Sequence, residues 1–249
     1  MSQMARLLSI MDRLRDKETG CEWDRAQDFK SIAPYTIEEA YEVADAIAKD
    51  DMAELKEELG DLLFQVVFHS QMAAERKSFD FHEVVDVISD KMETRHPHIF
   101  GGESGKIAEK RWEEIKERER ANKGAQSGMD GIALALPALL RSEKLQKRAA
   151  RAGFDWHDAK GPIAKFQEEL EELQEAETDE ERLMEAGDLL FVAVNIVRKF
   201  GIAPEDALRA SNGKFEKRFR AMETFAEGKF ADLSLDEKEA LWQQVKRAE

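Results

Sequence analysis

"EELGDLLF" at residues 57–64 is followed by a second copy, "EAGDLLF", at residues 185–191. In each copy a Glu precedes an Asp by three residues, and a long apolar run, "LLFQVVF" or "LLFVAVNIV", overlaps the end of the motif. These runs do not alternate with period two, so they predict helices that are apolar on nearly every side and lie in the middle of a bundle. The first such helix is predicted from about Met52 to Ala74. A carboxylate at the edge of a core loses part of its hydration, and another interaction must compensate for the free energy lost.

The repeat extends along most of the chain and keeps its order. Partner motifs are separated by 123 to 133 positions, as expected for two homologous domains with small insertions and deletions. The further pairs are "GCEWD" (20–24) with "GFDWH" (153–157), "EEAYE" (38–42) with "EELEE" (168–172), "KMETR" (91–95) with "KFEKR" (214–218), and "RWEEIK" (111–116) with "LWQQVK" (241–246). Between the copies, "ERERANKGAQSGMDG" (117–131) changes from charged helix to linker composition. We therefore predict domains at 1–118 and 132–249, joined by a linker at 119–131.

The composition favours an all-α protein. Of the 249 residues, 42% are hydrophobic and 37% are charged, and only five are Pro, which suits long amphipathic helices. The net charge of -15 argues against nucleic acid as a partner, because phosphate backbones favour clusters of Lys and Arg. Cys21 is the single cysteine, which excludes an intrachain disulfide and fits a reducing cytosol. No stretch approaches the roughly 18 apolar residues of a membrane span. We expect a soluble cytoplasmic protein without a membrane partner.

The acidic residues are spaced to share helix faces. In "EExxE" and in "ExxD" the acids are three or four positions apart, so each set projects from one side of its helix. Two such helices packed antiparallel bring four or five carboxylates together, and these repel one another unless they share protons or bind cations. Oxygen ligands favour Mg²⁺, Mn²⁺ or Ca²⁺ over zinc, and Mg²⁺ keeps positions that substrate phosphates can fill. A solvated helix face is the alternative, and the duplication of the pattern argues against it.

One basic pair and one tryptophan complete the pattern in each half. Lys91 with Arg95, and Lys214 with Arg218, stand four positions apart and could grip a polyphosphate, although ordinary surface charge is the alternative. Trp112 and Trp242 could stack on a base, although a Trp at helical spacing more often belongs to a core. Carboxylates, cations, a phosphate clamp and an aromatic ring together predict a nucleoside polyphosphate site.

Four stretches carry a resemblance to a known family. They are "PYTIEEAYEV" (34–43), "EELGDLLFQVVFHSQMA" (57–73), "RHPHIFG" (95–101) and "LPALLRSEKLQKRAARAGFDW" (136–156). Together they resemble the MazG family of nucleoside triphosphate pyrophosphohydrolases in its tandem-domain form, over nearly the whole chain. One departure is "GCEWD", in which Glu22 stands where the family usually has Pro, and we expect it to affect a loop only.

The resemblance implies an all-α fold of two helical-bundle domains that pair with another subunit as a homodimer. It also implies Mg²⁺-dependent hydrolysis of ribo- and deoxyribonucleoside triphosphates to monophosphate and pyrophosphate, with broad base tolerance and with Mn²⁺ as a substitute. The implied metal ligands are Glu39, Glu42, Glu58 and Asp61 in the first half and Glu169, Glu172, Glu185 and Asp188 in the second. The implied substrate contacts are Lys165, Glu168, Lys214, Arg218 and Trp242, with Lys91, Arg95 and Trp112 as first-half candidates.

Some roles stay open at this point. Glu38 and Glu168 are candidates for orienting or deprotonating the attacking water, or for supporting the residues that bind the cation. Cleavage of the α,β bond follows only from the resemblance. The competing hypothesis is a helical nucleotide-sensing or interaction protein in which one or both sites bind without turnover. Because tandem members of the family tend to use their second domain for catalysis, and "EELEE" is the more acidic copy, we expect the second half to be active. The sequence identifies no regulatory partner.

Overall fold

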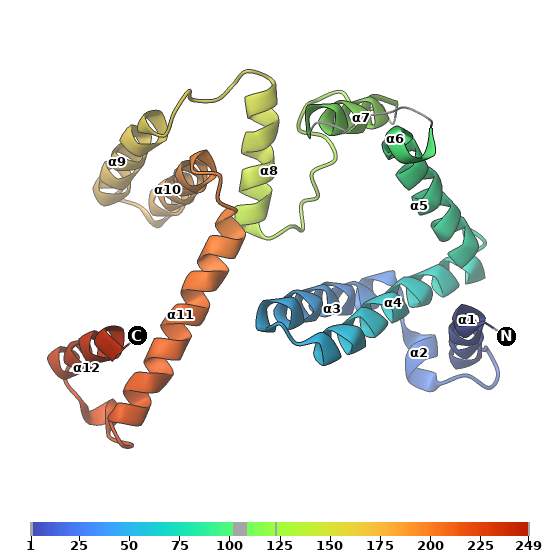
Figure 1. Cartoon of the computed structure of the whole chain (residues 1–249), viewed down its shortest axis with the longest axis horizontal. Coiled ribbons are helices and arrows are strands. Elements are labelled where there is room, and N and C mark those ends of the chain that lie inside the picture. Colours follow the sequence, from blue (N-terminus) through green and yellow to red (C-terminus); the bar gives the residue numbers. More distant parts are fainter. Residues whose placement is uncertain (1, 102–108, 123, 249) are drawn as a thin grey trace. The chain divides into compact units, whose positions relative to one another are not determined.

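A computed structural model describes residues 2–101, 109–122 and 124–248, without the side chains of 109–114 and 120. The chain divides into two compact units, Met1–Ile115 and Lys116–Glu249, and each is described by itself. Every regular element in the described ranges is a helix, which confirms the all-α prediction (Figure 1). The domain and linker limits drawn from composition stay a prediction.

The first unit is built on a long helical hairpin. Its helices are α1 (Gln3–Leu14), α2 (Glu22–Ala26), α3 (Phe29–Lys49), α4 (Met52–Glu75), α5 (Phe81–Arg95), α6 (Pro97–Phe100) and α7 (Glu109–Asn122), the last of which continues into the second unit. Asp28 and Asp51 begin α3 and α4, because each carboxylate accepts hydrogen bonds from two backbone N–H groups of the first turn. Asp50 makes the turn between these helices in the left-handed conformation, with φ of 56°. The hairpin sets α3 against α4, and α1 also packs on α4.

The core of the first unit lies where α1, α3 and α4 meet. Its buried members are Met11, Ile32, Val67, Phe68 and Met72. Four of these five come from α1 and the C-terminal half of α4, so the apolar run "LLFQVVF" is anchored at its far end. The acidic residues at the beginning of α4 lie outside this core.

The second unit repeats the hairpin. Its helices are α8 (Ala138–Arg151), α9 (Lys160–Glu175), α10 (Asp179–Lys199), α11 (Pro204–Phe225) and α12 (Leu235–Ala248), with a short 3-10 turn at Phe230–Asp232. Thr178 and Glu181 form a capping box that begins α10. The α9–α10 hairpin corresponds to α3–α4, and α8 packs on α10 (Figure 1). Helix α12 packs on α11, where the rings of Phe215 and Trp242 lie 5.6 Å apart.

The two long apolar helices are covered on only part of their surface within one chain. Leu59 and Leu63 of α4 are exposed, and so are Leu183, Met184 and Leu190 of α10, with Leu183 76% exposed. The prediction that these helices lie in the middle of a bundle is therefore confirmed for the C-terminal half of α4, where the side chains are buried. It is wrong for the exposed leucines and the methionine just named. In the part of the chain that the structure describes, no helix is both long enough and apolar enough to cross a membrane.

Candidate functional site

Three acids of the first unit meet between α3 and α4. Glu39 comes from α3, and Glu58 and Asp61 come from one face of α4, and one carboxylate oxygen from each lies within 4.8 Å of the others. Gln65, two turns beyond Glu58, is buried and donates from Nε2 to Glu39 Oε1 at 3.4 Å. This group has the carboxylates that the sequence predicts on facing helices.

The first-unit acids raise one another's affinity for protons. Burial raises the pKa of Glu39, and the charges of Asp61 and Glu42 raise it further, while the hydrogen bond from Gln65 opposes the shift. Burial likewise raises the pKa of Glu58, followed by the charges of Glu42 and Asp61. Carboxylates arranged in this way are stabilised either by a proton or by a cation.

Three acids of the second unit form the matching group between α9 and α10. One oxygen each from Glu169, Glu172 and Glu185 lies within 4.8 Å of the other two. Glu169 is only 4% exposed, whereas Glu172 is at the surface. Burial raises the pKa of Glu172, the charge of Lys165 opposes the rise, and Glu169 and Glu185 add to it.

Lys165 sets the second group apart from the first. Its Nζ lies 2.7 Å from an oxygen of Glu168 and 2.7 Å from an oxygen of Glu169. One ammonium group therefore bridges the exposed carboxylate of Glu168 and the buried carboxylate of Glu169. These two hydrogen bonds raise the pKa of Lys165. When "EEAYE" is aligned with "EELEE" in the repeat, Tyr35 of the first unit corresponds in sequence to Lys165 of the second. The second unit therefore has its own positive charge beside the acids, and the first has a phenol at that position.

The remaining predicted acids lie around the two groups. Glu42 acts on Glu39 through its charge and a side-chain hydrogen bond, although it is outside the set of three. Asp188 is exposed and is also outside the matching set. Glu38 and Glu168 are exposed, and Glu168 is held by Lys165.

The two basic pairs predicted to contact phosphate lie on other helices than the acids of their unit. Arg218 lies over the ring of Trp242, 5.4 Å from its centre, and Lys214 is one turn earlier on α11. Among the described residues, α11 contacts α8, α10 and α12, and it has no extensive contact with α9. Lys91 and Arg95 lie in the last turns of α5, which contacts α4 and α6. The side chain of Trp112 is outside the described residues.

The two carboxylate groups suit a divalent cation of the oxygen-preferring class. Three carboxylates converge in each, and Mg²⁺ or Mn²⁺ accepts such ligands while keeping positions for water and phosphate. Sequence reasoning missed Gln65, which orients Glu39. The signal was present, because Gln65 is the single polar residue in the run "LLFQVVF".

The pH dependence of stability tests the first group. The pKa of Glu58 is raised in the folded protein, so folding favours its protonated form. This contribution to stability is complete below the ordinary pKa of 4.5, and it is lost as the pH rises through the raised pKa. We expect Glu58→Gln to increase the free energy of unfolding of the metal-free protein at pH 8 and to have a smaller effect at pH 4.5. Urea unfolding in EDTA at both pH values measures the difference. Saturating Mg²⁺ should reverse its sign at pH 8, and a gain that is equal at both pH values would contradict this interpretation.

Comparison with known proteins follows the two-unit division. A family model described as the MazG nucleotide pyrophosphohydrolase domain matches residues 27–100, and one described as phosphoribosyl-ATP pyrophosphohydrolase matches residues 143–212. The chain is 48% identical over 260 residues to the nucleoside triphosphate pyrophosphohydrolase of Escherichia coli (strain K12), covering 100% of this chain and 99% of that one. It is 42% identical over 243 residues to the nucleoside triphosphate pyrophosphohydrolase/pyrophosphatase MazG of Thermotoga maritima, covering 96% and 94%. The chain therefore belongs to the MazG family of nucleotide pyrophosphohydrolases.

Proposed function

We propose that the chain hydrolyses nucleoside triphosphates to nucleoside monophosphate and pyrophosphate, and that its second unit carries out the reaction. The observation that carries this proposal is the convergence of Glu169, Glu172 and Glu185 between α9 and α10, with Lys165 beside them. Full-length similarity to relatives named for this activity supports it. Ribo- and deoxyribonucleotides with different bases are the proposed substrates.

We propose Mg²⁺ as the cofactor, with Mn²⁺ as a substitute. Glu169, Glu172 and Glu185, joined by Asp188, would hold it in the second unit, and Glu39, Glu42, Glu58 and Asp61 would do so in the first. When bound, such a cation neutralises the triphosphate and lowers the pKa of a coordinated water.

The chain's own residues have separate tasks in this scheme. Glu169 is buried and held by Lys165, so it provides a fixed ligand, whereas the exposed Glu172 can adjust its position. Glu168 faces solvent next to the group and can accept a proton from the attacking water or orient that water. Lys165 is long and partly exposed, so its ammonium can move from the acids to a phosphate oxygen.

We further propose that a second copy of the chain completes the site. Lys214, Arg218 and Trp242 belong to the α11–α12 pair, which packs against α8 and α10 and has no extensive contact with α9. The exposed apolar residues at the beginning of α10 are next to the carboxylates and would be buried by a partner. Sedimentation equilibrium should give twice the chain mass of 28.4 kDa, and a mass equal to one chain at micromolar concentration would exclude this pairing.

A second candidate function applies to the first unit. Tyr35 stands where the second unit has Lys165, so the first group lacks this positive charge beside its acids. That difference favours nucleotide or cation binding without turnover in the first unit. In this proposal the nucleotide-sensing hypothesis applies to the first unit, and catalysis applies to the second unit.

Product analysis tests the proposed function. Incubation with ATP and Mg²⁺, followed by ³¹P nuclear magnetic resonance, should show AMP and pyrophosphate in equal amounts, and EDTA should stop the reaction. Formation of ADP and orthophosphate would contradict the proposal, because it reports cleavage of the other phosphoanhydride bond.

A further inference from the structure

Gln65 of the first unit has a buried oxygen without a hydrogen-bond partner. The residue is 8% exposed, and its Nε2 donates to Glu39 Oε1 at 3.4 Å. Oε1 of the same amide is buried and accepts no hydrogen bond among the residues that the structure describes. A buried polar atom without a partner costs free energy, and such atoms in proteins usually have one. This oxygen therefore points to a ligand.

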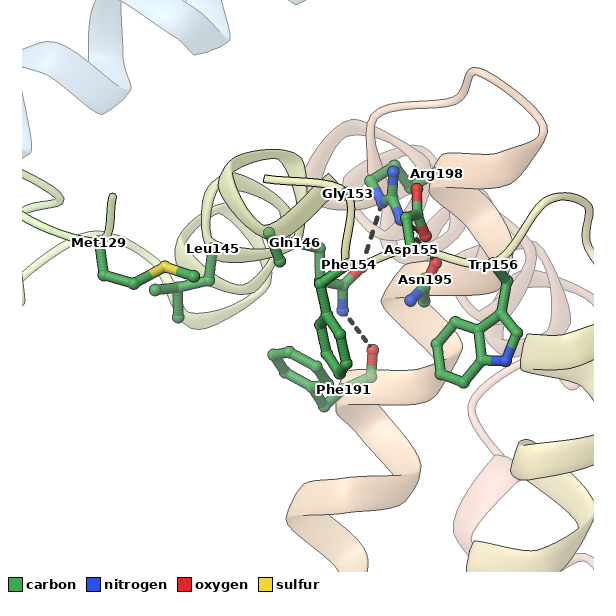
Figure 2. A pocket seen from close by; sticks show the side chains of 11 residues that line it. Met129, Leu145, Gln146, Gly153, Phe154, Asp155, Trp156, Phe191, Asn195 and Arg198 are labelled. Atoms are coloured by element: carbon green, nitrogen blue, oxygen red, sulfur yellow. Dashed lines mark hydrogen bonds and ion pairs between the residues drawn. The ribbon is translucent and has the colours of Figure 1, made fainter. Parts of the chain in front are cut away.

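Two other buried side-chain amides have partners for their oxygens. Gln146 Oε1 accepts a hydrogen bond from Arg198 Nε at 3.3 Å, and Asn195 Oδ1 accepts one from Arg198 Nη2 at 2.8 Å (Figure 2). Both residues are buried, as Gln65 is, and both belong to the second unit. An unpartnered amide oxygen is therefore not a general property of buried amides in this fold.

Gln65 lies on the same face of α4 as two of the carboxylates. It follows Glu58 by seven residues and Asp61 by four, and this spacing aligns the three side chains along the helix. Helical side chains lean toward the N-terminus of their helix, which directs the amide of Gln65 back toward these acids. Its Oε1 and Nε2 are bonded to one carbon, so the unpartnered oxygen is beside the atom that contacts Glu39. A cation held by the three carboxylates would have this oxygen within reach.

The acids of the first unit have no positive side chain beside them. Among the described residues, no Lys or Arg forms an ion pair with Glu39, Glu58 or Asp61. The position that corresponds to Lys165 of the second unit is held by Tyr35, which carries no positive charge. Carboxylates that repel one another without a positive partner attract a cation.

The second unit already has a positive charge among its acids. The ammonium of Lys165 lies 2.7 Å from Glu168 and 2.7 Å from Glu169. With the 127-residue offset of the repeat, Val192 stands where the first unit has Gln65, so α10 has no amide oxygen at this position. A metal ion that enters this group meets the ammonium, which must first find another anion. The two units therefore differ in what they offer to a free cation.

We propose that the first unit binds a divalent cation in the absence of nucleotide, with Gln65 Oε1 as a neutral ligand beside Glu39, Glu58 and Asp61. Carboxylate and amide oxygens suit Mg²⁺, Mn²⁺ or Ca²⁺. In the second unit the cation enters together with the triphosphate, because Lys165 then moves to a phosphate oxygen. The inference rests on the proposed function for this behaviour of the second unit. The first unit thus responds to the free concentration of divalent ions.

Titration with Mn²⁺ alone, followed by electron paramagnetic resonance of the free ion, tests the proposal on the full-length protein. We expect binding without nucleotide, and we expect Gln65→Val to weaken it about tenfold or more through the loss of a ligand. Val suits this position, because Val192 is 6% exposed at the corresponding place. Gln65→Glu keeps an oxygen there and should retain the binding. An unchanged affinity in Gln65→Val, or an equal loss in Gln65→Glu, would overturn the proposal.

Two variants of the second unit are the matched controls. Glu185→Gln should leave the nucleotide-free binding of Mn²⁺ unchanged. Lys165→Met should add Mn²⁺ binding to the second unit, because it removes the ammonium from the acids. If Glu185→Gln abolished the nucleotide-free binding, the ion would belong to the second unit and the proposal would be wrong. No gain in Lys165→Met would overturn the proposed difference between the two units.

The same titration separates this proposal from the proposed function. If the protein hydrolyses no triphosphate but binds Mn²⁺ alone, and Gln65→Val weakens that binding, the proposed function fails and the first-unit cation site stands. If the protein hydrolyses triphosphates but binds no Mn²⁺ in the absence of nucleotide, the first-unit cation site fails and the proposed function stands.

Discussion

Glu185→Gln is expected to lower kcat/KM for a nucleoside triphosphate by about 10³-fold, since a lost ligand weakens the charge stabilisation that a bound cation provides. Glu185 is one of three acids whose oxygens lie within 4.8 Å of one another, and Gln has the same shape without the charge. Steady-state hydrolysis with pyrophosphate detection measures the change. Circular dichroism of the variant shows whether the helices are retained.

The repeat provides a matched control for this experiment. Glu58 holds the same position in the first unit, is also half-buried and also belongs to a set of three acids. We expect Glu58→Gln to change kcat/KM by about threefold or less, because Tyr35 replaces Lys165 there. Equal losses in the two variants would contradict the division of work, and a loss confined to Glu58→Gln would reverse it.

Lys165→Met is expected to destabilise the metal-free protein by about 2–3 kcal/mol, because it leaves the buried Glu169 without its partner and beside two other carboxylates. A divalent cation can neutralise the same acids. Saturating Mg²⁺ should therefore restore more stability to this variant than it adds to the unsubstituted protein. Urea unfolding with EDTA and with Mg²⁺ gives both free energies.

Lys147→Met is the control for that experiment. Lys147 lies 2.7 Å from Glu143, which is also buried and is also four positions from its lysine, although here the acid comes first; among the described residues this pair belongs to no group of three carboxylates. Both variants should lose stability, and only Lys165→Met should recover with Mg²⁺. Equal recovery in the two would show that Lys165 has no special relation to the cation site.

The sequence was sufficient to predict the helices and the facing acids. A helix was expected from about Met52 to Ala74, and α4 spans Met52–Glu75. The spacing of Glu58 and Asp61 placed them on one face, and the structure brings both to Glu39. These features follow from helical periodicity, which depends on local sequence alone.

Features that depend on side-chain packing could not be predicted in the same way. Periodicity does not show that α11 lies apart from α9, so the separation of Lys214 and Arg218 from the acids appears only in the structure. The same holds for a cavity of about 650 Å³ in the second unit, because its existence depends on what α8 and α10 leave unfilled (Figure 2). One signal was readable: Asn195 interrupts the apolar run "LLFVAVNIV" at the position where the first copy has Phe68.

The carboxylates of the second unit are proposed to hold the cations used in hydrolysis. Electron paramagnetic resonance of Mn²⁺, titrated in the presence of a non-hydrolysable triphosphate analogue, counts the ions that bind together with the nucleotide. We predict that Glu185→Gln loses the ions bound by the second unit, whereas Glu58→Gln keeps these ions and loses only those of the first unit. Binding of the same number of Mn²⁺ ions with the same affinity by the unsubstituted protein and by Glu185→Gln would show that Glu185 does not bind the cation.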